Sequence, residues 1–240
     1  MTTEGVTRGA TLLGEPLPVE LMNTVTMDRG RTYDALDSDA GATAWLRAVA
    51  DRFRTEAGID AGELDEDAVR PVAATLRALR DALRRLASEA TRDPRPPATA
   101  AEFARPEAIS TLNALAQAWT ELVWPADGPP SRVYRGSGTA PDLAVRLIAH
   151  QAVDLFAGPD LERLHPCPAP NCPLFFVKNH ARREWCSPVC GNRARVARHY
   201  HRHHAALLPG LRGRQLPADA GLPADGARMS PVLDRRGEPR

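Results

Sequence analysis

The residues of this sequence best suited to chemistry are its four cysteines, which all fall between positions 167 and 190 with the spacing Cys167-x4-Cys172-x13-Cys186-x3-Cys190. The first residues do not resemble an export signal, and closely spaced cysteine pairs in a chain that is not exported favour a metal over disulfides. Four thiolates suit tetrahedral Zn²⁺ and close its coordination shell. We therefore expect one structural zinc ion, with no open position for a catalytic water.

Two alternatives stay open for these cysteines. They could form disulfides or remain free thiols, and a histidine could replace one of them as a metal ligand. Six of the seven histidines lie in the same region, namely His165, His180, His199, His201, His203 and His204.

The residues around the cysteines indicate how the chain folds about the metal. Leu174–Val177 is a compact strand candidate, and Arg183–Trp185 is the expected return strand of a hairpin. Ser187 suits the N-cap of a helix and Pro188 its first position, which places Cys190 in the first helical turn. A knuckle, a hairpin and a helix in this order are typical of a treble-clef zinc finger.

The helix that follows Cys190 is strongly basic. In a helical projection Val189, Val196 and Tyr200 share one face, which we expect to rest on the finger. Another face carries a row of cations that can bind the phosphates of DNA or RNA, and asparagine or arginine can also contact base edges. The candidate nucleic-acid contacts are Asn192, Arg193, Arg195, Arg198 and Arg202.

The charge of the whole chain is unevenly distributed. Residues 1–160 hold 17 arginines against 24 acids, whereas residues 161–240 hold 14 lysines and arginines against 6 acids. This asymmetry favours either a polyanionic partner for the C-terminal part or attraction between the two halves of the chain. The sequence does not separate these alternatives.

Most of the remaining sequence has helical periodicity, so the expected fold is mainly α with a small β component. Apolar residues recur every three or four positions in four segments, and a weak hairpin signal surrounds Pro125–Pro130. The expected helices span residues 42–56, 66–90, 109–118 and 141–156. We expect a flexible arm over 1–14, a mostly helical domain over 15–160, a zinc finger over 161–204 and a disordered tail over 205–240.

Two parts of the sequence resemble a known family. The Cys-x4-Cys pair, the Trp-Cys-Ser-x2-Cys step and the run Cys190-Gly191-Asn192-Arg193 resemble the CGNR zinc finger. The N-terminal segment, with Asn23-Thr24, an Asp-rich stretch and Trp45-Leu46, is similar to the start of the ABATE domain, which precedes this finger in bacterial proteins described as stress-induced transcription regulators. The resemblance covers about residues 15–204. It implies zinc binding by the four cysteines and DNA binding by the basic helix.

The function we expect is that of a DNA-binding transcription regulator in the cytoplasm. RNA binding, a homodimer and a small-molecule effector of the N-terminal domain are left open, and no membrane association is expected because long apolar runs are absent. The alternative is an interaction module whose basic helix docks on the acidic N-terminal domain or on a partner. We do not expect an enzyme, since the polar group Asn23, Asp28, Arg29 and Arg31 fits loop and capping roles and matches no catalytic motif.

Overall fold

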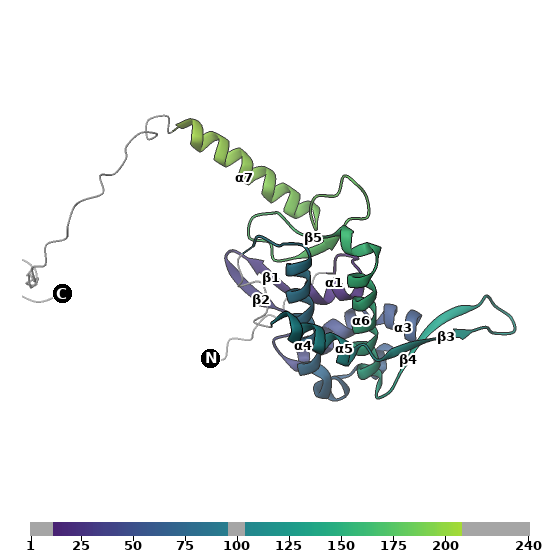
Figure 1. The fold of residues 1–240 in the computed structure, drawn as a ribbon. Coiled ribbons are helices and arrows are strands. Elements are labelled where there is room, and N and C mark those ends of the chain that lie inside the picture. Colours follow the sequence, from purple (N-terminus) through teal and green to yellow (C-terminus); the bar gives the residue numbers. More distant parts are fainter. Residues whose placement is uncertain (1–11, 96–103, 208–240) are drawn as a thin grey trace, which may run out of the picture. The chain divides into compact units, whose positions relative to one another are not determined.

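The computed structural model describes residues 12–95 and 104–207, which form a mainly helical fold with short antiparallel hairpins (Figure 1). The α-helices are α1 Leu17–Met22, α2 Asp39–Ala48, α3 Ala50–Ala57, α4 Glu66–Ala90, α5 Arg105–Leu115, α6 Ala140–Ala157 and α7 Pro188–Leu207. Two 3₁₀-helices, η1 Ala61–Glu63 and η3 Pro159–Arg163, lie between them. The expected fold class is therefore confirmed.

The central element is α4, which packs against α1, α2, α5 and α6. Its bounds match the predicted span of 66–90. The Asp65 side chain caps the helix by accepting a hydrogen bond from the backbone N–H of Ala68, at 2.9 Å. Pro71 lies inside the helix on its exposed side and does not end it. The buried stripe of α4 forms the middle of the helical core, and it includes Val69, Val72, Leu76, Leu79 and Leu83.

The prediction of one helix over residues 42–56 is wrong. The chain forms α2 and α3 instead, and the break lies at Val49, whose φ of −104° and ψ of 8° end the first helix. The two helices have different partners, since α2 packs on α4 whereas α3 packs on α6 and β4 (Ser131–Gly136). Local periodicity could not reveal this change of partner. The side chains of Trp45 and Phe53 are nevertheless both buried.

The β3–β4 hairpin and α6 follow the predictions closely. Strand β3, Ala118–Val123, pairs antiparallel with β4, and Figure 1 shows the hairpin running away from the helices. Helix α6 starts at a capping box in which the Thr139 side chain accepts from Asp142 N–H and the Asp142 carboxylate accepts from Thr139 N–H. Helix α5 was predicted over 109–118. It begins earlier, at Arg105, because Pro106 suits a first helical turn, and it ends at Leu115, before β3 begins.

One further hairpin lies between α1 and α2, where the sequence analysis predicted no helix or strand. Strands β1 Val25–Asp28 and β2 Arg31–Asp34 pair antiparallel around a two-residue turn. Arg29 and Gly30 form this turn with φ values of 48° and 78°, a left-handed conformation that glycine adopts without strain.

The hairpin of the finger uses a different strand from the one expected. Strand β6, Phe175–Val177, pairs with β5, Leu164–Pro166, which precedes the first cysteine. Residues 183–185, the predicted return strand, form bends and loop. The correct pairing closes the hairpin around the first two cysteines, so the knuckle is the connection between its strands.

Strand β6 is shared between two hydrophobic cores. Successive side chains of a strand point to opposite faces. Phe175 accordingly packs into the core of the helical domain, whereas Phe176 packs into a smaller cluster that contains the four cysteines. The finger hairpin therefore lies between the helical core and the cysteine cluster and contributes side chains to both.

The chain divides into two compact units between His199 and Tyr200. The described part of the second unit is the end of α7, which continues to Leu207 and so includes the first three residues of the predicted tail, 205–207. The rest of the predicted tail, residues 208–240, and positions 1–11 of the predicted arm lie outside the described residues.

Candidate metal centre and nucleic-acid interface

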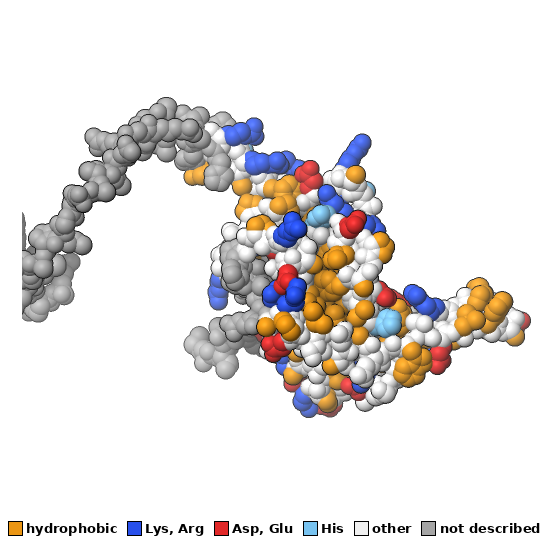
Figure 2. Space-filling model, in the orientation of Figure 1, with side chains coloured by type: hydrophobic (Ala, Val, Ile, Leu, Met, Phe, Trp, Pro, Cys, Tyr) orange, Lys and Arg blue, Asp and Glu red, His pale blue; other side chains and the backbone are white. Residues whose placement is uncertain are grey.

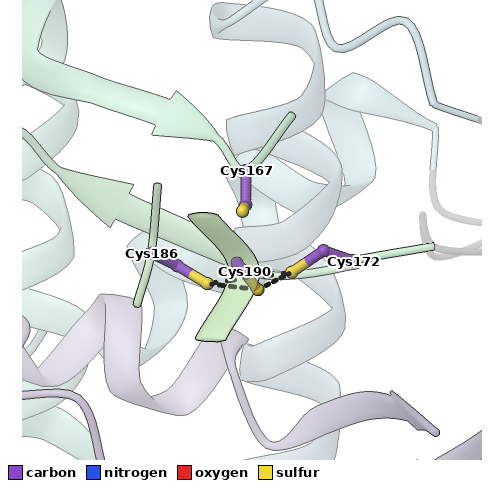
Figure 3. Close-up of side chains that lie close together, drawn as sticks. All are labelled: Cys167, Cys172, Cys186 and Cys190. Atoms are coloured by element: carbon purple, nitrogen blue, oxygen red, sulfur yellow. Dashed lines mark hydrogen bonds between the residues drawn. The ribbon is translucent and has the colours of Figure 1, made fainter. Parts of the chain in front are cut away.

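The four cysteines come from both sides of the finger and meet at one point. Cys167 directly follows β5, and Cys172 ends a short turn in which Asn171 has a left-handed φ of 56°. Cys186 lies in the loop before α7, and Cys190 lies in the first turn of that helix. Figure 3 shows their sulfurs pointing toward one another.

The sulfur positions fit one tetrahedral zinc ion. All four sulfurs lie within 4.8 Å of one another and are buried. The sulfur of Cys190 is 3.4 Å from that of Cys186 and 3.7 Å from that of Cys172. Zn–S bonds of about 2.3 Å place neighbouring sulfurs about 3.8 Å apart in a tetrahedron. A disulfide requires about 2.05 Å, so the cysteines are free thiols that can together hold one zinc ion.

The pKa values of the four cysteines also favour binding of a cation. Hydrogen bonds from the neighbouring cysteines lower the pKa of Cys167 to about 7 and lower the pKa of Cys190 as well. Hydrogen bonding within the same cluster raises the pKa values of Cys172 and Cys186. Four sulfurs this close therefore cannot all ionise by themselves. A bound Zn²⁺ removes the conflict, because a metal-bound thiol is deprotonated.

The start of α7 follows the predicted capping pattern. The Ser187 hydroxyl accepts a hydrogen bond from the backbone N–H of Cys190 at 3.4 Å, and Pro188 is the first helical residue. Gly191 lies against the indole of Trp185, where a Cβ atom would come within 2.9 Å of the ring. A side chain at this position would push Trp185 away, so the glycine permits the close approach of helix and loop.

Arg193 belongs to the metal centre. Its Nη2 donates a hydrogen bond to the Cys190 sulfur at 3.0 Å, and the side chain is partly buried. Burial opposes the charge of Arg193, but the hydrogen bond and the nearby cysteine charges outweigh it and raise the pKa of the guanidinium. A zinc ion with four thiolates carries a net charge of about −2, which this arginine partly balances. The sequence alone grouped Arg193 with the nucleic-acid contacts.

Residues of the helical domain hold the finger hairpin in place, and sequence analysis did not find them in this role. The Asn23 side chain pairs with the backbone of Phe175 in both directions, donating to its C=O and accepting from its N–H, each at 2.9 Å. The guanidinium of Arg84 donates to the carbonyls of Met22 and Pro173 at 2.6 and 3.3 Å. These contacts join positions far apart in the sequence, so no local pattern signals them.

Two more arginines hold the backbone of the finger, Arg95 from the helical domain and Arg183 from the finger itself. Arg95 donates to the carbonyls of Cys172 and Leu174 at 2.8 and 2.9 Å, and its guanidinium lies 4.6 Å from the centre of the Phe175 ring. Arg183 forms an ion pair with the buried carboxylate of Glu15, which also accepts from the Val177 N–H at 2.9 Å. The backbone around the metal is therefore fixed by buried charged groups.

The other candidate nucleic-acid contacts on α7 are exposed. Asn192, Arg195 and Arg198 are exposed, as is Arg202 in the second unit. The Asn192 side chain accepts a hydrogen bond from Arg195, and the guanidinium of Arg198 lies 5.9 Å from the centre of the Trp185 ring. The predicted row of cations therefore exists as an exposed helix face.

The apolar face of α7 is not where we expected it. Val189 and Val196 are both 70% exposed, so they do not rest on the finger, and Tyr200, in the second unit, is 60% exposed. Among the α7 positions whose burial the structure describes, the buried ones are instead Cys190, Gly191 and Ala194. These small side chains allow the helix to lie close to the metal cluster, which a face built from valine and tyrosine would prevent.

The polar group considered for enzyme chemistry is not brought together as a site. Asn23 is buried and bonded to β6, whereas Arg29 and Arg31 are exposed at the turn of the β1–β2 hairpin. Within the described residues, none of the helices is both long enough and apolar enough to span a membrane.

Comparison with known families agrees with this arrangement. Residues 15–159 match the model of the ABATE family, described as "Putative stress-induced transcription regulator", and residues 163–203 match the model of the CGNR zinc finger. No curated protein matches the chain. The first match covers more than half of the sequence and the second contains all four cysteines. The chain thus belongs to the ABATE family and carries a CGNR zinc finger after its helical domain.

Proposed function

We propose that this protein is a zinc-containing transcription regulator that binds DNA through α7. The observation that carries the proposal is the exposed face with Asn192, Arg195 and Arg198, on a helix whose first turn holds a zinc ligand. The metal and the buried contacts of the finger fix the helix, so the arginines start from an ordered scaffold and lose little freedom on binding.

The chemistry of this face suits duplex DNA. Arginines bind phosphates with charge-assisted hydrogen bonds, and an α-helix fits the major groove of B-form DNA, where Asn192 or an arginine can contact base edges. The major groove of A-form RNA is too narrow for side chains to enter, which favours DNA over an RNA duplex. Arg193 serves the metal centre in this proposal and does not contact the nucleic acid.

The alternative of an internal clamp lacks the feature it requires. If α7 docked on the acidic helical domain, Arg195 and Arg198 would be buried against residues 1–160, yet both are exposed. We further propose that the protein is not an enzyme, because four thiolates leave zinc no open coordination position, and that it acts in the cytoplasm, where thiols stay reduced.

The proposal is tested by measuring binding of the zinc-loaded full chain to labelled duplex DNA by fluorescence anisotropy at several salt concentrations. Wild-type affinity should fall steeply with salt, because binding releases counterions from the phosphates. The double variant Arg195→Gln/Arg198→Gln should bind at least about tenfold more weakly. Its slope of log K against log salt should be smaller by about 2, since each phosphate contact contributes about 0.9.

The matched control is Arg47→Gln/Arg54→Gln, which removes the same charge from exposed positions on α2 and α3. This control should retain wild-type affinity. Equal losses in both double variants would mean that only the net charge matters, and salt-insensitive or absent binding would overturn the proposal. Stronger binding to single-stranded or duplex RNA would redirect it from DNA to RNA. A selection from random oligonucleotides would then identify the preferred sequence.

A further inference from the structure

The β3–β4 hairpin carries large apolar side chains that the described chain leaves uncovered. Trp119 is 52% exposed, Leu122 72% and Trp124 69%. Cross-strand pairing places Trp119 and Leu122 on opposite faces of the hairpin, and Trp124 directly follows the end of β3. Large apolar side chains thus lie on both faces of the hairpin. Figure 2 shows the resulting group of hydrophobic side chains at its far end.

The helical domain holds the base of this hairpin. Tyr134 is buried near α6, where its ring lies edge-on to that of His150, and Arg146 donates to the Gln117 side chain at 3.1 Å. Two-stranded hairpins are marginally stable in water unless they pack against another surface. The outer part, Leu122–Trp124, therefore needs a partner.

The same chain offers a matching hollow on another surface. A cavity of about 380 Å³ opens between α4, α5, α6 and η3, and its volume exceeds that of a tryptophan side chain. Its walls are mainly apolar, with Leu86, Ile109, Leu112, Val153, Phe156 and Leu161. The rim carries the ion pair of Arg105 with Glu89, at 3.0 Å, and the Asn113 side chain.

We propose that two copies of this chain form a two-fold dimer in which the hairpin tip of each copy, Leu122–Trp124, occupies the cavity between α5 and α6 of the other. Figure 1 shows the hairpin leading away from its own helices, so the tip reaches a second copy more readily than its own cavity. In such a dimer the same contact, hairpin tip in cavity, occurs twice. It covers the apolar tip and the apolar cavity of each copy and leaves no site for a third copy.

The area involved is that of a stable dimer. The exposed parts of the tip side chains amount to roughly 400–500 Å² per hairpin, given that large aromatic side chains bury about 150–250 Å² each. Two hairpins would bury roughly 800–1,000 Å² of their own surface, and an equal area on the cavities and the surfaces around them would bring the total to the standard size of a specific interface. One hairpin seated alone would bury about half of this.

The test is the oligomeric state of the zinc-loaded full chain without nucleic acid, measured by sedimentation velocity and light scattering. Wild type should be a dimer. Leu122→Ser/Trp124→Ser should weaken the dimer at least about tenfold, and Ile109→Glu, at a 42% exposed position of the cavity wall, should do the same. The matched controls are Asp127→Ser in the hairpin loop and Ser110→Glu beside Ile109, both at exposed positions outside the proposed contact.

Mixing the two disrupted variants distinguishes exchange from any other dimer. The intact hairpin of the Ile109→Glu copy can still enter the intact cavity of the Leu122→Ser/Trp124→Ser copy. The mixture should therefore form a heterodimer, weaker than the wild-type dimer, while neither variant dimerises alone. Circular dichroism establishes that each variant is folded.

A photo-crosslinking residue in place of Trp124 provides a second measurement if the Ile109→Glu variant does not fold. Cross-links should join position 124 of one copy to α5 or η3 of a differently tagged copy. A monomer at concentrations up to about 100 µM, a dimer that the hairpin variant leaves unchanged, cross-links within one chain or open-ended polymers would each overturn the proposal. A hairpin variant that stays dimeric but loses DNA binding would assign the tip to nucleic acid instead.

Discussion

The arginines on the two sides of the finger differ in their surroundings. On the side of the helical domain, Arg84 and Arg95 are directed at backbone carbonyls next to the first two metal ligands. On α7, the side chains of Arg195 and Arg198 are exposed. The number of arginines in a segment therefore says little about its role. The environment of each guanidinium separates those that hold the fold together from those available to a polyanion.

Removing the metal should have the largest effect, because it disturbs both sides at once. Without zinc, four buried thiols lose the ion that holds them together, and structural zinc contributes on the order of 10 kcal/mol in small fingers. A chelator should unfold the finger, lower the thermal transition of the whole chain and abolish DNA binding. Readdition of Zn²⁺ should restore all three. A chelated chain that keeps its transition temperature would show that the buried arginines alone hold the finger.

Arg84→Met should be the most damaging change on the buried side. Burial lowers the pKa of Arg84 to about 10. The buried guanidinium donates hydrogen bonds to backbone carbonyls on two separate segments. Leaving those carbonyls without a donor should cost about 3 kcal/mol of unfolding free energy, measured by urea denaturation. Its control is Arg85→Met, which removes a more exposed pair with Glu89 and should cost about 0.5 kcal/mol.

Asn23→Ala should weaken the same side by a smaller amount. It removes both hydrogen bonds to the backbone of Phe175, at an expected cost of about 2 kcal/mol. Hydrogen exchange should show faster exchange at the Phe175 amide, while Asn179→Ala in an exposed loop of the finger should leave that amide unchanged. Unchanged exchange in Asn23→Ala would mean that β6 is held by its apolar contacts alone.

Arg195→Gln/Arg198→Gln should have the smallest effect on stability. Both side chains are exposed, so the unfolding free energy should change by less than about 0.5 kcal/mol although DNA affinity falls. Urea denaturation of this variant beside Arg84→Met completes the comparison. A large loss of stability here would show that the outer arginines also support the fold.

Local patterns predicted the parts of the structure that local forces decide. The periodicity of α4 and α6, the capping role of Ser187 and the cysteine spacing each depend on neighbours within a few residues, and the structure confirms them. The break at Val49 depends instead on which surfaces α2 and α3 meet, and the pairing of β6 with β5 depends on the closure of the knuckle. The contact between Asn23 and Phe175 spans 152 positions in the chain, which no window of sequence contains.

The projection of α7 shows the same limit within a single helix. It placed Arg195 and Arg198 on one face and Val196 and Tyr200 on another, but it could not tell which face meets the finger. The cysteine cluster determines which face of α7 meets the finger, because Cys190 must point at the other sulfurs. Ala194, one helical turn later, therefore faces inward as well. A ligand residue therefore sets the rotation of a helix more strongly than its apolar stripe does.

Strand β6 makes this finger unsuitable for transplantation. One of its faces completes the core of the helical domain through Phe175, and the other lines the cysteine cluster through Phe176. A chimaera that carried residues 163–203 onto a foreign protein would expose Phe175 to water and strip the knuckle of the donors from Arg84 and Arg95. Under the proposed function, DNA recognition would be altered by substitutions along α7, whereas an exchange of whole fingers would have to bring the complementary surface of α4 with it.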